Sequence, residues 1–246
     1  VFQHGGAYGV MQNHLIQDYE LNLSNRFLSW GWVHTKFPKV YPFFRIKKVR
    51  ITKRKFRKSY KVIFIGPPHK FNFTGSSEPC CDQYIETSIT RIINFLGMLP
   101  DKHNWIIRGR IDSWRLNDYF QNNLGFTVDT QSNVRHLISN AEVVVVPYPS
   151  TTLLECILSS TPTLEWFPQS EYPISRLAKP YYQDLAKSYI YHSDEKTLLS
   201  LLTVTDLDAW WNDPNVLESR YFFANTFAFP SDHIARDIND VVRKLI

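Results

Sequence analysis

The chain of 246 residues has little cysteine and no long apolar run. Its three cysteines, Cys80, Cys81 and Cys156, form neither a disulfide framework nor a zinc-ligand spacing, so we expect a reduced, cytoplasmic protein. No apolar run approaches the roughly 20 residues that a membrane-spanning helix needs. Because 43% of the residues are hydrophobic and 15% aromatic, the composition is typical of a globular protein with a substantial core.

Two nucleotide-binding motifs are also missing. The glycine-containing segment Gly66–Ser77 follows an apolar run and is long and polar, which suits a ligand-binding loop. It has neither the G-x-G-x-x-G spacing of dinucleotide sites nor the final G-K-[ST] of the P-loop. The sequence therefore lacks these two nucleotide-binding motifs, although phosphate binding and a Rossmann-like sheet both stay possible.

Positive charge is concentrated in a single segment. Arg45–Lys61 holds ten Lys and Arg residues and no acid, whereas the remaining 229 residues hold 18 basic and 23 acidic residues. Such a segment attracts polyanions such as the headgroups of an anionic membrane surface, and it equally suits a solvated linker or strand edge. Because no aromatic stacking motif or recognition helix accompanies it, nucleic acid is not an expected partner.

Strand-like and helix-like segments alternate from Tyr60 onward. β-branched or apolar runs that stop at turn residues are typical of buried parallel strands, and apolar spacings of three and four indicate helices. We expect strands at 60–65, 104–108, 126–129, 142–146, 163–167 and 189–191, and helices at 81–99, 113–123, 134–139, 151–159, 174–186, 194–202, 206–211 and 233–245. This alternation predicts an α/β fold with a Rossmann-like, doubly wound parallel sheet.

Residues 1–59 precede this alternation and form a separate region. We expect an entry strand at 1–3, a glycine loop, a second short strand near 26–30 and then the basic segment. The predicted organisation is therefore an interdomain segment with a His-Gly-Gly loop and a basic linker at 1–59, followed by a Rossmann-like domain at 60–246.

The stretch Glu142–Glu155 is the most informative part of the domain. An apolar run is followed by a proline-containing turn, by Ser150, Thr151 and Thr152, and by a helix. A helix N-terminus has unpaired N–H groups and partial positive charge, so it suits a phosphate, and Glu155 lies one turn further on. The same hydroxyls are also the usual residues that cap a helix, and both interpretations stay open.

A second candidate site lies in the glycine loop near the N-terminus. His4 is followed by Gly5, Gly6 and Tyr8, and glycines allow a sharp bend and close approach of a ligand. Histidine titrates near neutral pH and can act as a general base, although a single histidine can also be structural. Asp18 and Glu20 are further candidate bases.

Arginine follows another expected strand, at Arg108-Gly109-Arg110. Guanidinium groups suit phosphate or carboxylate ligands because they bind them in a bidentate manner. Surface charge is the alternative interpretation of this pair.

Three motifs in order resemble bacterial surface-polysaccharide transferases of the glycosyltransferase B fold. The motifs are Q-H-G-G-A-Y-G at 3–9, N-R-F-L-S-W-G-W at 25–32 and Y-P-S-T-T-L-L-E at 148–155, and A-K-P-Y-Y at 178–182 is similar as well. The nearest resemblance is to a transferase family first defined in spirochaetes. More distantly, the pattern is similar to Kdo transferases and to the glycerophosphotransferases of teichoic acid synthesis, although Arg110-Ile111 departs from the latter.

This resemblance implies a metal-independent glycosyltransferase with no cofactor. Its nucleotide-sugar donor, with a CMP-linked sugar favoured, would bind Gly5, Gly6, Tyr8, Arg110, Ser150, Thr151, Thr152 and Glu155, and His4 and Glu20 would be catalytic. The acceptor would be a glycan or lipid-linked glycan, reached at the inner membrane face through Arg45–Lys61.

In that family fold a second Rossmann-like domain holds the acceptor contacts. We therefore expect this chain to be the C-terminal, donor-binding half of a glycosyltransferase B-type fold with its interdomain segment. A non-catalytic nucleotide- or glycan-binding module and a nucleotide-sugar epimerase are the alternatives.

Overall fold

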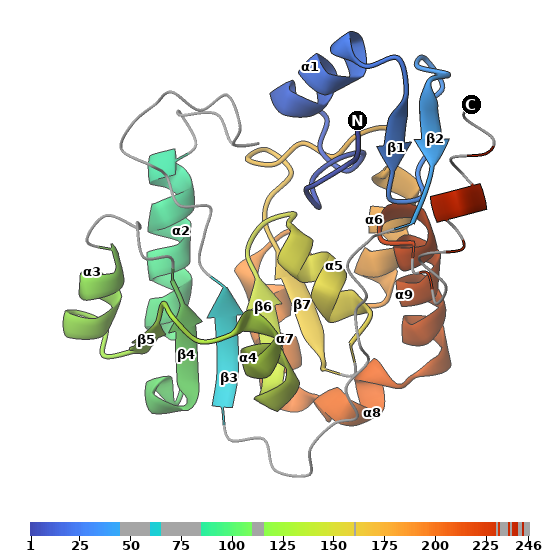
Figure 1. Ribbon diagram of the computed structural model, residues 1–246. Helices are drawn as coiled ribbons and strands as arrows, with labels where there is room; N and C mark the ends of the chain where they lie inside the picture. The colour runs from blue at the N-terminus through green and yellow to red at the C-terminus, as the bar shows by residue number, and fades with distance from the viewer. Residues whose placement is uncertain are drawn as a thin grey trace.

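The centre of the protein is a parallel sheet of six strands (Figure 1). The computed structural model describes residues 1–44, 60–64, 85–109, 116–159, 161–229, 231, 236, 238–240 and 243. The strands of this sheet are β3 (Tyr60–Phe64), β4 (Trp105–Arg108), β5 (Thr127–Asp129), β6 (Ala141–Val146), β7 (Thr163–Trp166) and β8 (Tyr191–His192).

The strand order confirms the predicted doubly wound fold. The order is β5-β4-β3-β6-β7-β8, and every neighbouring pair is parallel. Numbered within this sheet, it is the 3-2-1-4-5-6 order of the Rossmann fold. The direction of winding reverses between β3 and β6, and in such sheets ligands bind outside the carboxyl ends of the strands at this point.

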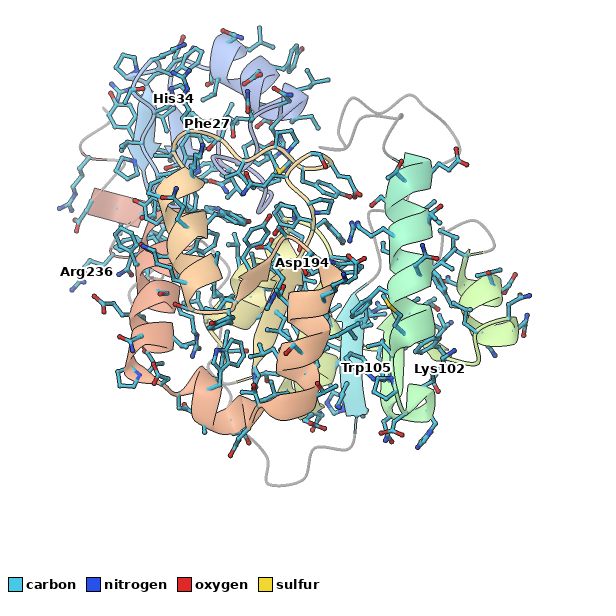
Figure 2. The ribbon with its side chains drawn as sticks, turned by 180° about the vertical axis from the view of Figure 1, so that it is seen from behind. Phe27, His34, Lys102, Trp105, Asp194 and Arg236 are labelled. Atoms are coloured by element: carbon cyan, nitrogen blue, oxygen red, sulfur yellow. The ribbon has the colours of Figure 1, made fainter. Side chains whose placement is uncertain are left out.

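Helices cover both faces of the sheet. They are α2 (Ile85–Met98), α3 (Leu116–Asn122), α4 (Val134–Asn140), α5 (Thr151–Ile157), α6 (Lys179–Lys187), α7 (Glu195–Val204), α8 (Leu207–Trp211) and α9 (Pro214–Phe227), with a 3₁₀ turn at Lys102–Asn104. In Figure 1, α4 and α5 lie in front of the sheet, whereas α2 and α7 lie behind it and come to the front in Figure 2.

The two faces of β6 explain why its sequence is apolar throughout. Val143 and Val145 pack into a cluster with α2 and α7, whereas Val144 and Val146 pack into a second cluster with α4 and α5. Successive side chains of a strand point to opposite faces, so a strand with helices on both sides buries every residue.

The N-terminal segment lies over the carboxyl ends of the strands. It consists of α1 (Leu15–Leu23) and a separate two-stranded parallel sheet of β1 (Phe27–Ser29) and β2 (Val40–Pro42). Figure 1 shows these elements above the large sheet, and Phe27 is labelled among them in Figure 2. Tyr8, Phe27 and Trp32 belong to the same buried cluster as Leu153 of α5, so this segment is packed onto the site edge of the sheet. The predicted boundary at residue 59 stays a prediction.

In the N-terminal region, α1 and β2 were not predicted, and the expected entry strand at 1–3 is reduced to a single bridge between Phe2 and Leu28. From Tyr60 onward, most expected elements form within a few residues of their predicted positions, with two differences. α6 begins at Lys179 rather than at residue 174, because Pro180 occupies its first turn, where proline is favoured, and Ile174 instead bridges to Met11. The helix α9 was not predicted at all. Its N-cap, Asp213, accepts from the N–H of Asn215 at 2.8 Å and is followed by proline, a typical helix start.

The predicted helix at 233–245 lies largely outside the described residues. Among the described helices, none is both long and apolar enough to cross a membrane.

A buried carboxyl group lies in the core beside β8. Glu165 of β7 has no exposed surface, and its Oε1 accepts from the hydroxyl of Tyr182 at 3.2 Å. Its Oε2 has no hydrogen-bond partner within the described part of the chain. Burial raises the pKa of Glu165 well above its usual range, and the hydrogen bond from Tyr182 offsets this rise only in part. The side chain is therefore neutral over a wide pH range.

Glu165→Gln is expected to change how stability depends on pH. An acid with a raised folded pKa loses stability as the pH rises from its unfolded value toward the folded value, by up to about 1.4 kcal/mol per pH unit. Burial also lowers the pKa values of the buried His14 and His192 and of the half-buried His34. These histidines add no pH dependence to the stability above about pH 6.5. In urea denaturation, the parent protein should therefore lose stability relative to the variant as the pH rises above the unfolded pKa of a glutamate. Parallel profiles for the two proteins would show that Glu165 ionises normally.

Candidate active site

The His-Gly-Gly loop is held in place by Gln3. Its Oε1 accepts from the N–H of Trp30 and from the indole Nε1–H of Trp32, both at 2.8 Å, and its Nε2 donates to the carbonyl of Gly5 at 2.7 Å. Gln3 is buried, so each of these bonds matters because a buried polar group without a partner is costly. The W-G-W block therefore positions the loop through Gln3.

The other end of the loop is fixed to the segment after β7. The hydroxyl of Ser175 donates to the carbonyl of Gly9 at 2.7 Å, and the N–H of Ser175 donates to the carbonyl of Val10 at 2.8 Å. Gly9 has a φ of +74°, and a Cβ there would lie 2.8 Å from the ring of Trp32. Only glycine fits this turn, both for its backbone conformation and for its space.

Within this frame, three predicted site residues come together. The Nε2 atom of His4 lies 3.0 Å from Oε1 of Glu20 and 2.7 Å from the hydroxyl oxygen of Tyr8. The hydroxyl of Tyr8 donates to Oε2 of Glu20 at 3.0 Å. The three side chains thus form a closed triangle between the loop and α1.

The hydrogen bonds of the triangle define the state of the imidazole. Tyr8 has one hydroxyl proton and gives it to Glu20, so its oxygen must accept from His4. The proton of a neutral His4 is therefore on Nε2, and its lone pair is on Nδ1. With 62% of its side chain exposed, compared with 20% for Glu20, His4 presents its ring to solvent.

Burial makes the groups behind His4 resistant to ionisation. The pKa of Tyr8 is raised strongly, first by burial and then by its hydrogen bond to Glu20 and the charge of that residue. His14 packs against Tyr8 with ring centres 4.4 Å apart, and burial lowers the pKa of His14. Its Nδ1 accepts from the N–H of Gln17 at 3.0 Å and so caps α1, which requires the neutral form of this ring.

The hydroxyl residues after β6 are at the start of α5, as predicted. Ser150 is the N-cap, and its hydroxyl accepts from the N–H of Leu153 at 3.3 Å. The hydroxyl of Thr151 accepts from the N–H of Gly6 at 2.9 Å. These two hydroxyl oxygens therefore stabilise the helix start and the loop above it.

Gly6 makes the closest approach between the two predicted motifs. A Cβ at this position would lie 2.5 Å from the backbone nitrogen of Thr151 and 2.6 Å from the carbonyl oxygen of Ser150. Any other residue would push the loop away from α5, since both neighbouring groups are backbone. The glycine at this position is therefore a requirement for the contact between the loop and the helix.

The other predicted donor-binding residues differ in what the structure says of them. Thr152 and Glu155 are half-buried in the first two turns of α5, and Gly5 is half-buried beside the ring of Tyr8. Arg110 lies outside the described residues, as do residues 45–59 of the basic segment and all of Gly66–Ser77. Their predicted roles stay predictions.

Arg108 and Asp18 do not join this cluster. The guanidinium of Arg108 donates to the carbonyl of Asp129 at 2.9 Å and lies 3.8 Å from its carboxylate, so it ties β4 to β5. Asp18 is exposed in the first turn of α1, where an acid is favoured by the helix dipole. The structure thus separates Glu20 from Asp18 as the candidate partner of His4.

Sequence reasoning missed one buried ion pair near the carboxyl ends of the strands. Arg91 of α2 binds Glu171 in a bidentate manner, with N–O distances of 2.9 to 3.2 Å, and its guanidinium lies 4.3 Å from the ring centre of Trp166. The signal in the sequence is a single basic residue in an amphipathic helix. This pair fixes α2 against the loop after β7.

Metal ligands were not predicted, and no group of three His, Cys, Asp or Glu side chains within the described ranges is placed to hold a metal ion. The chain does contain one D-x-D sequence, Asp206-Leu207-Asp208. Asp206 caps α8 through bonds from the N–H groups of Asp208 and Ala209 at 3.0 and 3.1 Å, at the opposite end of the sheet from α1 (Figure 1). Metal independence stays a prediction.

Comparison with known families agrees with the predicted resemblance. A model of the family described as LIC12162 family transferase matches residues 1–241. The chain belongs to the LIC12162 transferase family. The expectation of a transferase family is thereby confirmed, whereas the similarity to Kdo transferases and to teichoic acid glycerophosphotransferases stays a prediction. Membership of the LIC12162 family covers both the His-Gly-Gly loop and the start of α5.

One solved structure is similar to this family member over most of its length. It is titled "Crystal Structure Analysis of the Glycotransferase of kitacinnamycin", and the match covers 91% of this chain and 56% of that one, with 15% identity and a TM-score of 0.44. The chain thus spans little more than half the length of that structure. No curated protein matches the chain. The fold assignment rests on the strand order, because a superposition at this score carries no argument.

Proposed function

We propose that this transferase moves a sugar or sugar-like group from a nucleotide-activated donor to a glycan acceptor. The observation that carries the proposal is the hydrogen bond between the N–H of Gly6 and the hydroxyl of Thr151. It joins the loop of His4 to the start of α5, beside the point where the winding of the sheet reverses. A candidate base and a candidate phosphate site then lie at one edge of a Rossmann-like sheet, where nucleotide ligands bind.

On the acceptor side, His4 is the proposed general base. With Nε2–H directed at Glu20 and Tyr8, the Nδ1 lone pair can take the proton of an acceptor hydroxyl as that oxygen attacks the donor. The imidazolium that forms would be stabilised by the carboxylate of Glu20, as in other histidine–carboxylate pairs. Tyr8 would hold Glu20 in its orientation through the bond to Oε2.

On the donor side, the start of α5 would hold the phosphate. The hydroxyl oxygen of Ser150 caps the helix and that of Thr151 accepts from Gly6, so the Thr151 hydroxyl can still donate its own proton. Thr152 has no hydrogen bond from its side chain to the described residues. Thr151 and Thr152 would therefore donate to the phosphate, Arg110 would neutralise it, and Glu155 would bind ribose hydroxyls. Preorganised donors at the leaving group would be the main catalytic contribution.

The finer assignments follow from the family resemblance. A CMP-linked donor and a cell-surface glycan, free or lipid-linked, are proposed on that ground. The charge of Arg45–Lys61 supports a peripheral position at an anionic inner membrane face, where lipid-linked acceptors lie. Metal independence and a cytoplasmic location belong to the same proposal.

A panel of nucleotides tests the donor site. CMP, CDP, UDP and GDP would be added to the protein, and the shift in melting temperature measured. Thr152→Val is expected to abolish most of that shift while leaving the cap of Ser150 and the bond of Gly6 in place. The matched control is Thr203→Val, which removes a hydroxyl that bonds only within α7.

Two outcomes would contradict the proposal. The absence of a shift with every nucleotide would remove the donor site, and an undiminished shift in Thr152→Val would move it away from α5. Conversion of a nucleotide sugar in the absence of acceptor would favour the epimerase alternative, and nucleotide binding without transfer would favour a non-catalytic module.

A further inference from the structure

A large groove lies along α9 and reaches from the end of α6 to Asn225. Its volume is about 1330 Å³, and it is formed by the end of α6, by α8 and by one side of α9. Figure 1 shows α8 below the sheet and α1 above it, and Figure 2 shows α6 and α9 side by side. Pockets for small ligands commonly measure about 300–1,000 Å³, so this groove has room for a ligand larger than a typical small molecule.

Aromatic side chains line this groove and remain exposed. The exposed fractions are 58% for Tyr189, 57% for Tyr221 and 48% for Phe222. Trp210 is half-buried beside them, and its indole N–H donates to the carbonyl of Ser188 at 3.0 Å, which fixes the ring. Aromatic faces carry partial negative charge and so attract the polarised C–H groups on the flat faces of sugar rings.

The backbone of Tyr189 is unusual for such a side chain. Its φ is +58°, and it directly follows the C-cap of α6, Ser188. Glycine is the usual residue at this position because a Cβ is strained there. Since the ring is mostly exposed, burial does not compensate for the strain, and a strained exposed aromatic at a groove points to a binding role.

Polar groups complete the surface along α9. Asn215, Glu218 and Asn225 lie on the same side of the helix as Phe222 and have no side-chain hydrogen bond to other described residues. Amides and carboxylates supply both acceptors and donors for hydroxyl groups. Sugars present many hydroxyl groups next to apolar ring faces, and the groove offers partners for both.

The charge of the groove argues against an anionic ligand. Its charged lining consists of Asp184, Asp213 and Glu218 with one base, Lys187, and Lys187 is paired with Asp184 at 2.9 Å. A phosphate group or an anionic lipid surface would be repelled. We propose that this groove binds a neutral carbohydrate chain. The site is separate from the proposed donor site and does not rest on it.

Affinity electrophoresis in gels that contain a neutral polysaccharide tests this assignment. Dextran, galactomannan, xylan and hydroxyethylcellulose would each be used, with hexalysine and phosphatidylglycerol vesicles as competing ligand classes. We expect at least one neutral polysaccharide to retard the protein. Tyr221→Ala and Tyr189→Gly should weaken that binding about three- to tenfold, because each removes one aromatic face.

Tyr189→Gly separates binding from folding. Glycine relieves the strain at positive φ, so the melting temperature should stay the same or rise while carbohydrate binding weakens. The matched control is Tyr119→Ala, an exposed tyrosine on α3 away from the groove, which should bind as the parent does. Thr152→Val should also leave carbohydrate binding unchanged.

Several results would overturn the assignment. One is that none of the four polysaccharides retards the protein, and another is that the groove variants do not weaken the retardation. A third is that hexalysine or the vesicles bind to the groove in place of carbohydrate. A fourth is a dimer in sedimentation that Tyr221→Ala dissociates. The last result would identify a second copy of the chain as the occupant.

Discussion

Replacing His4 with alanine is expected to lower the turnover number for transfer by about 10²- to 10⁴-fold, the usual contribution of a general base. The loss should appear in kcat, with the KM for the donor little changed, because His4 contacts Tyr8 and Glu20 rather than the start of α5. Glu20→Gln should be affected less, since the amide can still accept from Nε2–H but cannot balance the charge of an imidazolium. The measurement is release of nucleotide from the activated sugar whose nucleotide gives the largest thermal shift.

His103→Ala is the matched control for this experiment. His103 is an exposed histidine in the 3₁₀ turn before β4, at the amino ends of the strands, and its loss should leave kcat unchanged. A His4→Ala enzyme that keeps a kcat within twofold of the parent would exclude His4 as the base and leave it as a structural residue of the loop.

Replacing Arg220 with methionine is expected to destabilise the fold by about 2–4 kcal/mol. The buried guanidinium donates to the carbonyls of Ile157, Ser159 and Trp211 at 2.7 to 3.1 Å and stacks on the ring of Trp211 at 3.7 Å. Hydrogen bonds from a charged donor contribute about 1.5–3 kcal/mol each. Part of that gain offsets the burial of the charge, which lowers the pKa of Arg220 to about 10.

The loss should be visible as a fall in melting temperature of about 5–15 °C, given roughly 2–4 °C per kcal/mol for a chain of this size. Lys187→Met is the matched control, because Lys187 is exposed and its pair with Asp184 is worth little in water. If both variants melt at the parent temperature, the three carbonyls must find other partners.

Arg220 also connects the core to the proposed donor site. Ile157 and Ser159 are at the C-terminal end of α5, so the arginine of α9 satisfies carbonyls that the helix leaves unpaired. Thr151, at the other end, contacts Gly6. α5 is thus fixed at both ends by segments remote in sequence, and Arg220→Met should weaken the nucleotide shift as well as the fold.

Local sequence was sufficient for the strand β6, the start of α5 and the alternation that defines the fold class. An apolar run of valines is buried in every arrangement that covers both faces of a sheet, and a serine before a helix caps it through a bond two or three residues away. These patterns depend on neighbours in the chain, so they can be recognised without the fold. The same reasoning placed α7 and α8, whose N-caps are Asp194 and Asp206.

Local sequence was not sufficient to predict α9 or the start of α6. α9 exposes Tyr221 and Phe222 and buries Arg220, so its apolar and polar faces are mixed and the helical pattern is weak. In α6, the apolar spacing runs back to Ile174, but that residue bridges to Met11, which is more than 160 residues away. A contact of that range competes with local helix formation and leaves no local signal.

The sequence by itself determined which residue types could carry chemistry: a histidine before two glycines, a carboxylate 16 positions on, and hydroxyls at a helix start. Only the tertiary structure decided which of them meet. It selected Glu20 over Asp18 as the partner of His4, and it gave the hydroxyl oxygens of Ser150 and Thr151 to the cap and to Gly6. Gly6 and Thr151 are 145 positions apart, and their contact follows from strand order and close packing. Both are properties of the whole chain, because pairing between distant segments depends on the surface that they bury together.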